Sequence, residues 1–265
     1  MKTVKTGAKV NLSLAVTGKR EGLHTLDMRV CTVSLFDGAE LLSGEGERFV
    51  FRSVPDGFEK ERFLPRLEEV YAKLRAAFGG SPRFALEKGI PSGAGLGGSS
   101  ALAVCMTRLW AAESGAAPSE DLLLSLGSDV PYMYRGGDAR VTGVGERVQA
   151  LPFCGREVLI LFPEGEVDTA KAYAEYDRMR AAGELPERAG EFFNDLFAPA
   201  VRLNAKVGEA YDILRAAGAR NVVMTGSGSA VCAFPESGEE CARLFAATKG
   251  LRRVRVRTLP AYDGN

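Results

Sequence analysis

The sequence lacks an excess of charge of either sign. Among its 265 residues, 34 Lys and Arg side chains balance 34 Asp and Glu side chains. Proteins that bind nucleic acid usually carry a basic excess or a basic stripe. The one candidate stripe lies at 252–257, where arginines alternate with Val254 and Val256, and this alternation is typical of a strand with one exposed face. The charge pattern therefore argues against a nucleic-acid partner.

The chain also lacks a long apolar run and a pattern of paired cysteines. No segment is apolar for long enough to predict a membrane span. Asn11 and Ser13 interrupt the apolar stretch near the N-terminus, which is unlike a signal peptide. The five cysteines are odd in number and contain no Cys-x-x-Cys pair, so neither a disulfide framework nor a zinc site is indicated. These absences favour a protein of the reducing cytoplasm without a membrane contact.

What the chain does contain is the composition of a folded globular protein, with 46% hydrophobic and 26% charged residues. Its periodicities predict helices at 59–78, 99–112, 119–126, 169–182, 191–217 and 237–248. They predict strands at 8–16, 28–36, 84–86, 132–148, 158–162, 222–224, 230–234 and 252–258. A polar segment at 183–190 predicts a loop. The second half therefore reads β-α-α-β-β-α-β, an α+β arrangement with an antiparallel sheet.

The stretch with the most chemistry runs from Pro91 to Ser100. Its four glycines allow the backbone to approach a ligand closely and to turn N–H groups toward it. An apolar segment follows and predicts a buried helix that starts at Ser99 or Ser100, with its positive dipole end at the loop. This combination predicts a phosphate site, in which the two hydroxyls cap the helix, bind phosphate or reach a Mg²⁺ ion. The alternative is a flexible turn with a serine N-cap.

Two familiar phosphate loops do not fit this stretch. A Walker A loop needs a lysine after the glycines, and none follows here. Gly93, Gly95 and Gly98 match Gly-x-Gly-x-x-Gly, and Glu113 lies about 20 residues further on, where a dinucleotide-binding fold has an acid. Glu113 falls at the end of the same predicted helix, however, and not on a second parallel strand. We therefore reject the dinucleotide-binding interpretation.

The pattern Pro-x-Gly-x-Gly-Leu-Gly-x-Ser-Ser-Ala resembles the phosphate loop of the GHMP kinases. Further motifs are similar, in kind and order, to those of members that act on a cytidine diphosphate derivative in the non-mevalonate isoprenoid pathway. These motifs are Ala8–Leu12, Thr17–His24, Leu126–Pro131, Gly143–Glu146, Asn194–Leu196 and Thr225–Ser229. The resemblance implies an α+β fold with a ribosomal-S5-like domain at about 1–150 and a ferredoxin-like domain at about 151–265. It also implies ATP and Mg²⁺ as cofactors.

The resemblance implies catalytic roles for Asp129 and Lys9. Asp129 would accept the proton of the acceptor hydroxyl, because phosphoryl transfer to an alcohol needs a positioned base. Lys9 would keep that carboxylate ionised and stabilise charge on the transferred group. Without the resemblance, Asp129 would be an ordinary turn or N-cap residue, and Lys9 a solvated lysine.

The resemblance also implies two sets of binding residues. The set for ATP is Lys88, Pro91, Gly93, Ala94, Gly95, Leu96, Gly97, Gly98, Ser99 and Ser100. The set for the acceptor is Asn11, His24, Thr169, Tyr173, Thr225 and Gly226. We expect His24 in the cytosine pocket, while Tyr173 either stacks on the cytosine or belongs to the core or rim. Lys88 either faces the nucleotide or is a surface charge at a strand end.

Three departures from the family pattern keep alternatives open. Leu23 replaces the usual Tyr, the loop has one glycine fewer, and Arg62-Phe63 stands where an Asn-Leu pair usually lies near the adenine. The alternatives are a GHMP kinase of the homoserine or mevalonate type, and an inactive paralogue that only binds a nucleotide or a partner. The presence of both Lys9 and Asp129 argues against the inactive paralogue. We expect a monomer or a homodimer.

Overall fold

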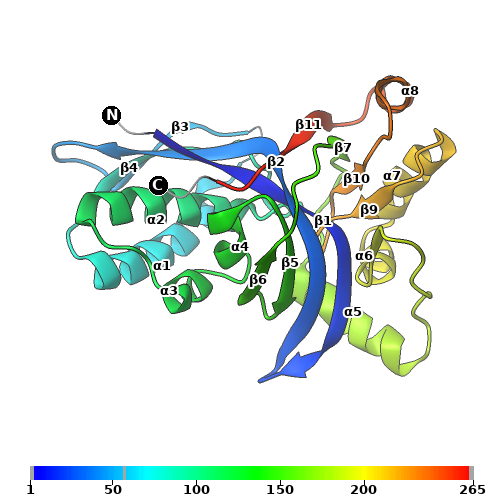
Figure 1. Cartoon of the computed structure of the whole chain (residues 1–265), viewed down its shortest axis with the longest axis horizontal. Helices are drawn as coiled ribbons and strands as arrows, with labels where there is room; N and C mark the ends of the chain where they lie inside the picture. Colours follow the sequence, from blue (N-terminus) through cyan, green and yellow to red (C-terminus); the bar gives the residue numbers. More distant parts are fainter. Residues whose placement is uncertain (1–2, 56–57, 263–265) are drawn as a thin grey trace.

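Two long antiparallel strands, β1 (Thr3–Arg20) and β2 (Leu23–Leu42), run through the middle of the protein (Figure 1). The computed structural model describes residues 3–55 and 58–262. Bulges interrupt the pairing of β1 with β2 after Gly7, Asn11 and Val16, and every residue at 6–16 is buried. The sequence predicted one polar face for this strand. Both faces of its central part are instead covered, so Lys9 and Asn11 lie inside the protein.

The first half places helices on one face of this ribbon. Its elements after β2 are β3 (Phe49–Ser53), α1 (Lys60–Phe78), β4 (Arg83–Glu87), α2 (Gly98–Ser114), α3 (Glu120–Ser125), α4 (Val130–Arg135), β5 (Asp138–Gly143) and β6 (Arg147–Ala150). The predicted helix α2 contacts β1, β2, α1 and α4, which explains why it is apolar almost all round. Figure 1 shows α1, α2 and α3 grouped beside one end of the β1–β2 ribbon.

The second half follows the predicted order of strands and helices, except that the short strand β8 lies between the first two helices. Its elements are β7 (Glu157–Leu161), α5 (Thr169–Ala181), β8 (Phe193–Asn194), α6 (Phe197–Leu203), α7 (Ala205–Ala216), β9 (Val222–Met224), β10 (Val231–Ala233), α8 (Gly238–Ala247) and β11 (Arg253–Leu259). β9, β10, β7 and β11 pair antiparallel, and the α+β class is confirmed. β11 also pairs with β2, so one continuous sheet path links both halves. The domain boundary near residue 150 stays a prediction.

Three local predictions differ from the structure. The strand expected at 132–148 begins instead as the short helix α4, because Pro131 stands in its first turn, where proline is favoured. The helical segment expected at 191–217 divides into β8, α6 and α7, and Asn204 caps α7 by accepting a bond from the N–H of Lys206. The short strand β3 was missed. The loop at 183–190 has no regular secondary structure, as predicted.

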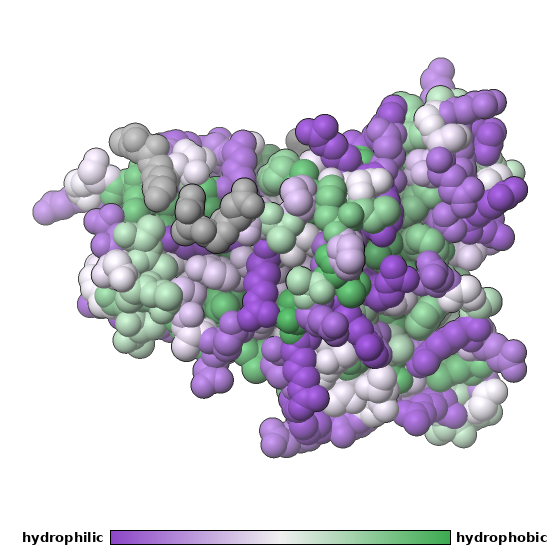
Figure 2. Space-filling model, viewed as in Figure 1, coloured by the Kyte–Doolittle hydropathy of each residue, from purple (hydrophilic) through white to green (hydrophobic). Residues whose placement is uncertain are grey.

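The hydropathy of the visible surface is mixed (Figure 2), as expected from the proportions of hydrophobic and charged residues in the sequence. The face in Figure 2 intersperses hydrophilic and hydrophobic residues over both halves. Over residues 3–55 and 58–262, no helix is long and apolar enough to cross a membrane.

Candidate active site

The glycine-rich loop lines a cavity of about 850 Å³. This volume lies in the upper part of the range for small-molecule sites. The β1–β2 hairpin, α5 and the segments before α2 and α4 also contribute walls. Of the predicted site residues, those that line the cavity are Lys9, His24, Pro91, Gly93, Ala94, Gly95, Leu96, Gly97, Gly98, Ser99, Ser100, Asp129, Thr169, Tyr173 and Gly226.

The backbone of the loop is shaped for an anion. Gly93, Gly95 and Gly97 have φ values of 68°, 72° and 74°, in the left-handed region that favours glycine. A Cβ atom on Gly95 would lie 2.1 Å from the carbonyl oxygen of Thr225, so no side chain fits there. The N–H groups of Gly95, Leu96 and Gly97 have no acceptor among the described residues. They are therefore available to a ligand such as phosphate.

The start of α2 differs from the expectation in one useful way. Its N-cap is Gly97 and not a serine, and no side chain caps it. Ser99 and Ser100 therefore lie within the first turn, and capping does not use their hydroxyls. The first N–H groups of a helix have no partner within the helix, and the helix dipole adds positive potential at the same end. The cavity thus has an anion-binding wall.

Lys9 and Asp129 meet at the edge of this wall. The Lys9 ammonium lies 3.7 Å from a carboxylate oxygen of Asp129, with side chains 6% and 31% exposed. Asp129 occupies the N-cap position of α4, but its carboxylate caps no N–H group and remains open to the cavity. The main-chain N–H of Lys9 donates to the carbonyl of Leu96 at 3.1 Å. One residue of β1 therefore contacts both the glycine loop and the carboxylate.

Asn11 and Thr225 lie behind the cavity and do not line it. The Oδ1 atom of Asn11 accepts bonds from the Lys9 ammonium at 2.8 Å and the Gly226 N–H at 2.9 Å. The Thr225 hydroxyl accepts from the Asn11 N–H at 3.0 Å and lies 3.2 Å from the carbonyl oxygen of Gly95. These bonds use the polar groups that we expected to face the acceptor. Both residues instead connect β1, the glycine-rich loop and the 225–229 segment.

Lys88 is neither a surface charge nor a residue of the cavity wall. Its ammonium forms an ion pair of 2.7 Å with Asp37, and both side chains are fully buried. Asp37 also accepts the N–H groups of Gly89 at 2.9 Å and Ile90 at 2.8 Å. Burial raises the pKa of Asp37 and lowers the pKa of Lys88, since desolvation disfavours both charges. The pair lies beneath the loop and holds the chain that enters it.

His24 and Tyr173 come together on the opposite wall. Their rings stack with centroids 4.5 Å apart and an interplanar angle of 20°. The His24 Nε2 atom lies 2.9 Å from a carboxylate oxygen of Asp177, on the same helix as Tyr173. Leu23, beside His24 at the hairpin tip, is 61% exposed and lines the cavity mouth. Because the two rings are already in contact, a base has no room between them.

Several residues that line the cavity were not predicted from the sequence. The charged one among them is Arg66. Arg66 projects from α1 into the cavity and donates to the carbonyl of Leu126. Its side chain is 31% exposed. A cation here suits an anionic ligand, but nothing in the local sequence distinguishes Arg66 from other arginines of a surface helix. Ser128 and Gly145 also line the cavity, and a Cβ on Gly145 would lie 2.2 Å from the Ser128 carbonyl oxygen.

Comparisons with known proteins agree with this geometry. The family model for the GHMP kinases N terminal domain matches residues 66–140. The model for the GHMP kinases C terminal domain matches residues 170–247. The 4-diphosphocytidyl-2-C-methyl-D-erythritol kinase of Thermus thermophilus is 33% identical, with 97% of this chain and 96% of that protein covered. The kinase of the same name from Chlorobaculum tepidum is 32% identical, with 98% and 97% covered.

Solved structures show the same fold. A crystal structure of 4-(cytidine 5'-diphospho)-2C-methyl-D-erythritol kinase has a TM-score of 0.75 and 30% identity, and covers 97% of this chain and 99% of its own. A crystal structure of mevalonate kinase has a TM-score of 0.68 with 12% identity, covering 98% of this chain and all (100%) of its own. The mevalonate kinase likeness, at that identity, concerns the fold alone.

Proposed function

Because the chain belongs to the GHMP kinase family, we propose that it transfers the γ-phosphoryl group of ATP to a hydroxyl of 4-diphosphocytidyl-2-C-methyl-D-erythritol. The observation that carries this proposal is the 3.7 Å approach of Lys9 to Asp129 beside the glycine loop. Relatives with this activity in their names match nearly the whole chain at 32–33% identity. Neither the homoserine- or mevalonate-type kinase nor the inactive paralogue receives comparable support.

We assign a role to each of the two ionic groups. The acceptor hydroxyl oxygen forms a bond to the γ-phosphorus while the bond from that phosphorus to the bridging oxygen of ADP breaks. Asp129 accepts the hydroxyl proton, and Lys9 supplies positive charge beside the transferred group. Catalysis of this kind depends mostly on positioning and electrostatic stabilisation, so a lysine and a carboxylate held on rigid elements are sufficient.

The loop residues fit the phosphates of ATP with a bound Mg²⁺ ion. The open N–H groups of residues 95–97 and the first turn of α2 would hold phosphate oxygens. The hydroxyls of Ser99 and Ser100 and the Asp129 carboxylate offer the oxygen ligands that Mg²⁺ prefers, and Mg²⁺ usually shares its coordination with substrate phosphates. The described residues contain no cluster of three or more acidic, His or Cys side chains that would hold a metal alone. Bound Mg²⁺ supplies charge neutralisation at the phosphates.

We assign the adenine to a neighbouring hollow. It has a volume of about 350 Å³ and shares Phe63, Pro91, Ser92 and Gly93 with the main cavity. Phe58 supplies another aromatic side chain, and Arg62 stands at this hollow in the family's usual asparagine position. We place the adenine there because the hollow continues directly from the first residues of the phosphate loop.

The acceptor would occupy the opposite end of the cavity. The stacked pair of His24 and Tyr173 offers an aromatic surface for the cytosine, with Leu23 at the rim. Because the pair leaves no gap, the base would lie on the free side of the pair or separate the two rings. Thr169 and Gly226 line the wall between this end and the phosphate loop. The acceptor hydroxyl would then reach Asp129.

We place this reaction in the cytoplasm, which supplies ATP and keeps thiols reduced. All five cysteines are free, and Cys154 is exposed. We also propose a monomer or a homodimer as the working form.

An acceptor panel tests the proposal. ADP production is followed with 4-diphosphocytidyl-2-C-methyl-D-erythritol, homoserine, mevalonate and free sugars as separate acceptors, each at equal ATP. We expect kcat/KM to be highest for the cytidine diphosphate derivative. A higher value for homoserine or mevalonate would assign the chain to another GHMP kinase, and absence of transfer to every acceptor would favour the inactive paralogue.

A further inference from the structure

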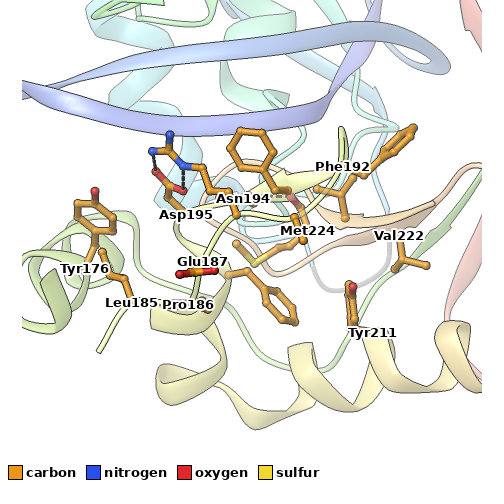
Figure 3. Close-up of a pocket in the computed structure, with 15 residues that line it drawn as sticks. Tyr176, Leu185, Pro186, Glu187, Phe192, Asn194, Asp195, Tyr211, Val222 and Met224 are labelled. Carbon is orange, nitrogen blue, oxygen red and sulfur yellow. Dashed lines mark hydrogen bonds and ion pairs between the residues drawn. The ribbon is translucent and has the colours of Figure 1, made fainter. Parts of the chain in front are cut away.

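A second cavity, of about 310 Å³, lies in the C-terminal half (Figure 3). Its walls come from α5, the segment 185–197, α7 and β9, and it shares no lining residue with the active-site cavity. The volume is at the lower end of the range for small-molecule sites. The reaction proposed above uses none of its side chains, so its composition calls for a separate explanation.

Aromatic rings dominate this second cavity. They belong to Tyr176, Phe192, Phe193, Phe197 and Tyr211. The rings of Phe197 and Tyr211 pack with centroids 4.8 Å apart. Aromatic faces carry negative potential and attract cations. The protein already uses this property here, because the guanidinium of Arg188 lies 5.4 Å from the centroid of Phe193.

The ionisable groups of the lining also favour a cation. Arg188 pairs with Asp195 through two bonds of 2.8 and 2.6 Å, which occupy both oxygens of that carboxylate. Asp195 further accepts the N–H of Val16 at 2.7 Å. Glu187 is the other carboxylate of the lining; its side chain is exposed, and no described residue forms an ion pair with it. Two carboxylates against one guanidinium give the lining one net negative charge, which the exposed Glu187 carries.

We propose that this cavity is an effector site for a small organic amine, in which a protonated amino group is attached to an apolar ring or short alkyl body. The rings and the apolar side chains of Leu185, Val222 and Met224 would enclose the body. Glu187 and the aromatic faces would receive the ammonium. An anionic ligand is disfavoured, because Asp195 already occupies the guanidinium fork of Arg188 and Glu187 would repel it.

Two contacts connect this cavity to the active site. Asn194 lines the cavity, and its side-chain amide donates to the carbonyl oxygens of Met224 at 2.7 Å and Gly226 at 2.8 Å. Gly226 in turn lines the active-site cavity. Tyr176 belongs to the same helix as Tyr173, about one turn away. An amine that prefers one arrangement of these elements therefore changes the affinity of the active site for its ligands.

Calorimetric titration of the full chain tests the ligand class. The probe is 2-phenylethylamine, compared with neutral 2-phenylethanol and anionic 3-phenylpropanoate, which share the phenyl group. We expect the amine to bind about five-fold or more tightly than the alcohol, since cation–π and ionic attraction each add affinity. Equal or tighter binding of the alcohol or the anion, or no binding of the amine, would overturn the assignment.

Matched variants locate the binding. Glu187→Gln should lower the affinity for the amine about five-fold. Glu191→Gln, an exposed control outside the lining, should leave the affinity for the amine unchanged. Tyr211→Leu should lower the affinity for the amine further, while circular dichroism should show an intact fold. Amine affinity that is unchanged in both lining variants would place the binding elsewhere.

Kinetics test the effector role. Saturating amine should change KM for ATP or for the acceptor by two-fold or more in the wild type. Without amine, Glu187→Gln should turn over at the wild-type rate. The same change in KM should need about five times more amine in this variant. Binding that left kcat and both KM values unchanged would overturn the effector role.

Discussion

The ammonium of Lys9, on β1, lies 3.7 Å from the carboxylate of Asp129, at the start of α4. The two residues are distant in sequence, and α2 contacts both of the elements that carry them. The contact joins a strand that precedes the glycine-rich loop in the sequence to a helix that follows it. It places a carboxylate and a cation at the edge of the glycine-rich loop.

Asp129→Asn should lower kcat by about 100-fold or more and leave ATP affinity nearly unchanged. The amide keeps the shape of the side chain but cannot accept the hydroxyl proton. Steady-state kinetics and ATP titration measure the two quantities. Asp121→Asn, on the exposed face of α3, is the control and should behave like the wild type. Turnover near the wild-type value in Asp129→Asn would remove this carboxylate from the mechanism.

Gly95→Val should abolish ATP binding, because a side chain there collides with the Thr225 carbonyl and occupies the phosphate path. Gly115→Val is a matched control. Gly115 has a φ of 71°, close to the 72° of Gly95, but a Cβ on it meets nothing within 4 Å. Both variants carry the backbone strain, and only the first disturbs the loop. Calorimetry measures ATP affinity, and equal affinity in the two folded variants would contradict the assignment.

Lys88→Met should destabilise the protein by about 3–5 kcal/mol, because it leaves the buried Asp37 carboxylate without its cation. Adding Asp37→Asn should recover part of this loss, since the neutral amide oxygen can still accept the N–H groups of Gly89 and Ile90. Chemical denaturation gives the free energies of unfolding. If the double variant were less stable than Lys88→Met alone, the account of the pair as a buried ionic anchor would fail.

Leu23→Tyr should strengthen the binding of CDP, because a ring at the exposed hairpin tip can stack on the base. Stacking contributes about 1–3 kcal/mol in single-strand binding proteins, which corresponds to roughly 5- to 150-fold in affinity. His24→Ala should weaken the binding of CDP, because it removes one ring of the stacked pair. ATP affinity should stay constant in both variants.

The inhibition pattern of CDP distinguishes the two ends of the cavity. CDP should compete with the acceptor and not with ATP. Competition with ATP alone would show that no cytidine pocket exists near His24, and it would redirect the assignment to another GHMP kinase.

The sequence predicted the elements whose signals are local. The apolar run after the glycines forms α2, and the second half has the predicted alternation of strands and helices apart from the inserted strand β8. The positions of Lys9 and Asn11 could not be predicted fully, because the bulges of β1 depend on its pairing with β2. Local sequence cannot reveal that both faces of a strand are covered.

The residues that motifs mark, in the glycine-rich loop and the aspartate segment, do line one cavity, and their roles stay predictions. The site was not predictable where a side chain finds its partner from a distant element. Lys88 precedes the loop in sequence, yet it contacts Asp37 from β2 and not the cavity. Arg66 reaches the cavity only because α1 packs beside α2. Such contacts follow from tertiary packing, which periodicity does not encode.

Phosphorus NMR of the complete reaction is the most direct test of the central claim. The protein, MgATP and 4-diphosphocytidyl-2-C-methyl-D-erythritol are mixed, and the phosphorus resonances are followed with time. The account predicts a new phosphomonoester resonance that grows in equal amount with ADP, while the diphosphate of the acceptor stays intact. It also predicts that Asp129→Asn slows this growth by about 100-fold or more. Formation of ADP with inorganic phosphate alone, or no change in the acceptor, would contradict the account.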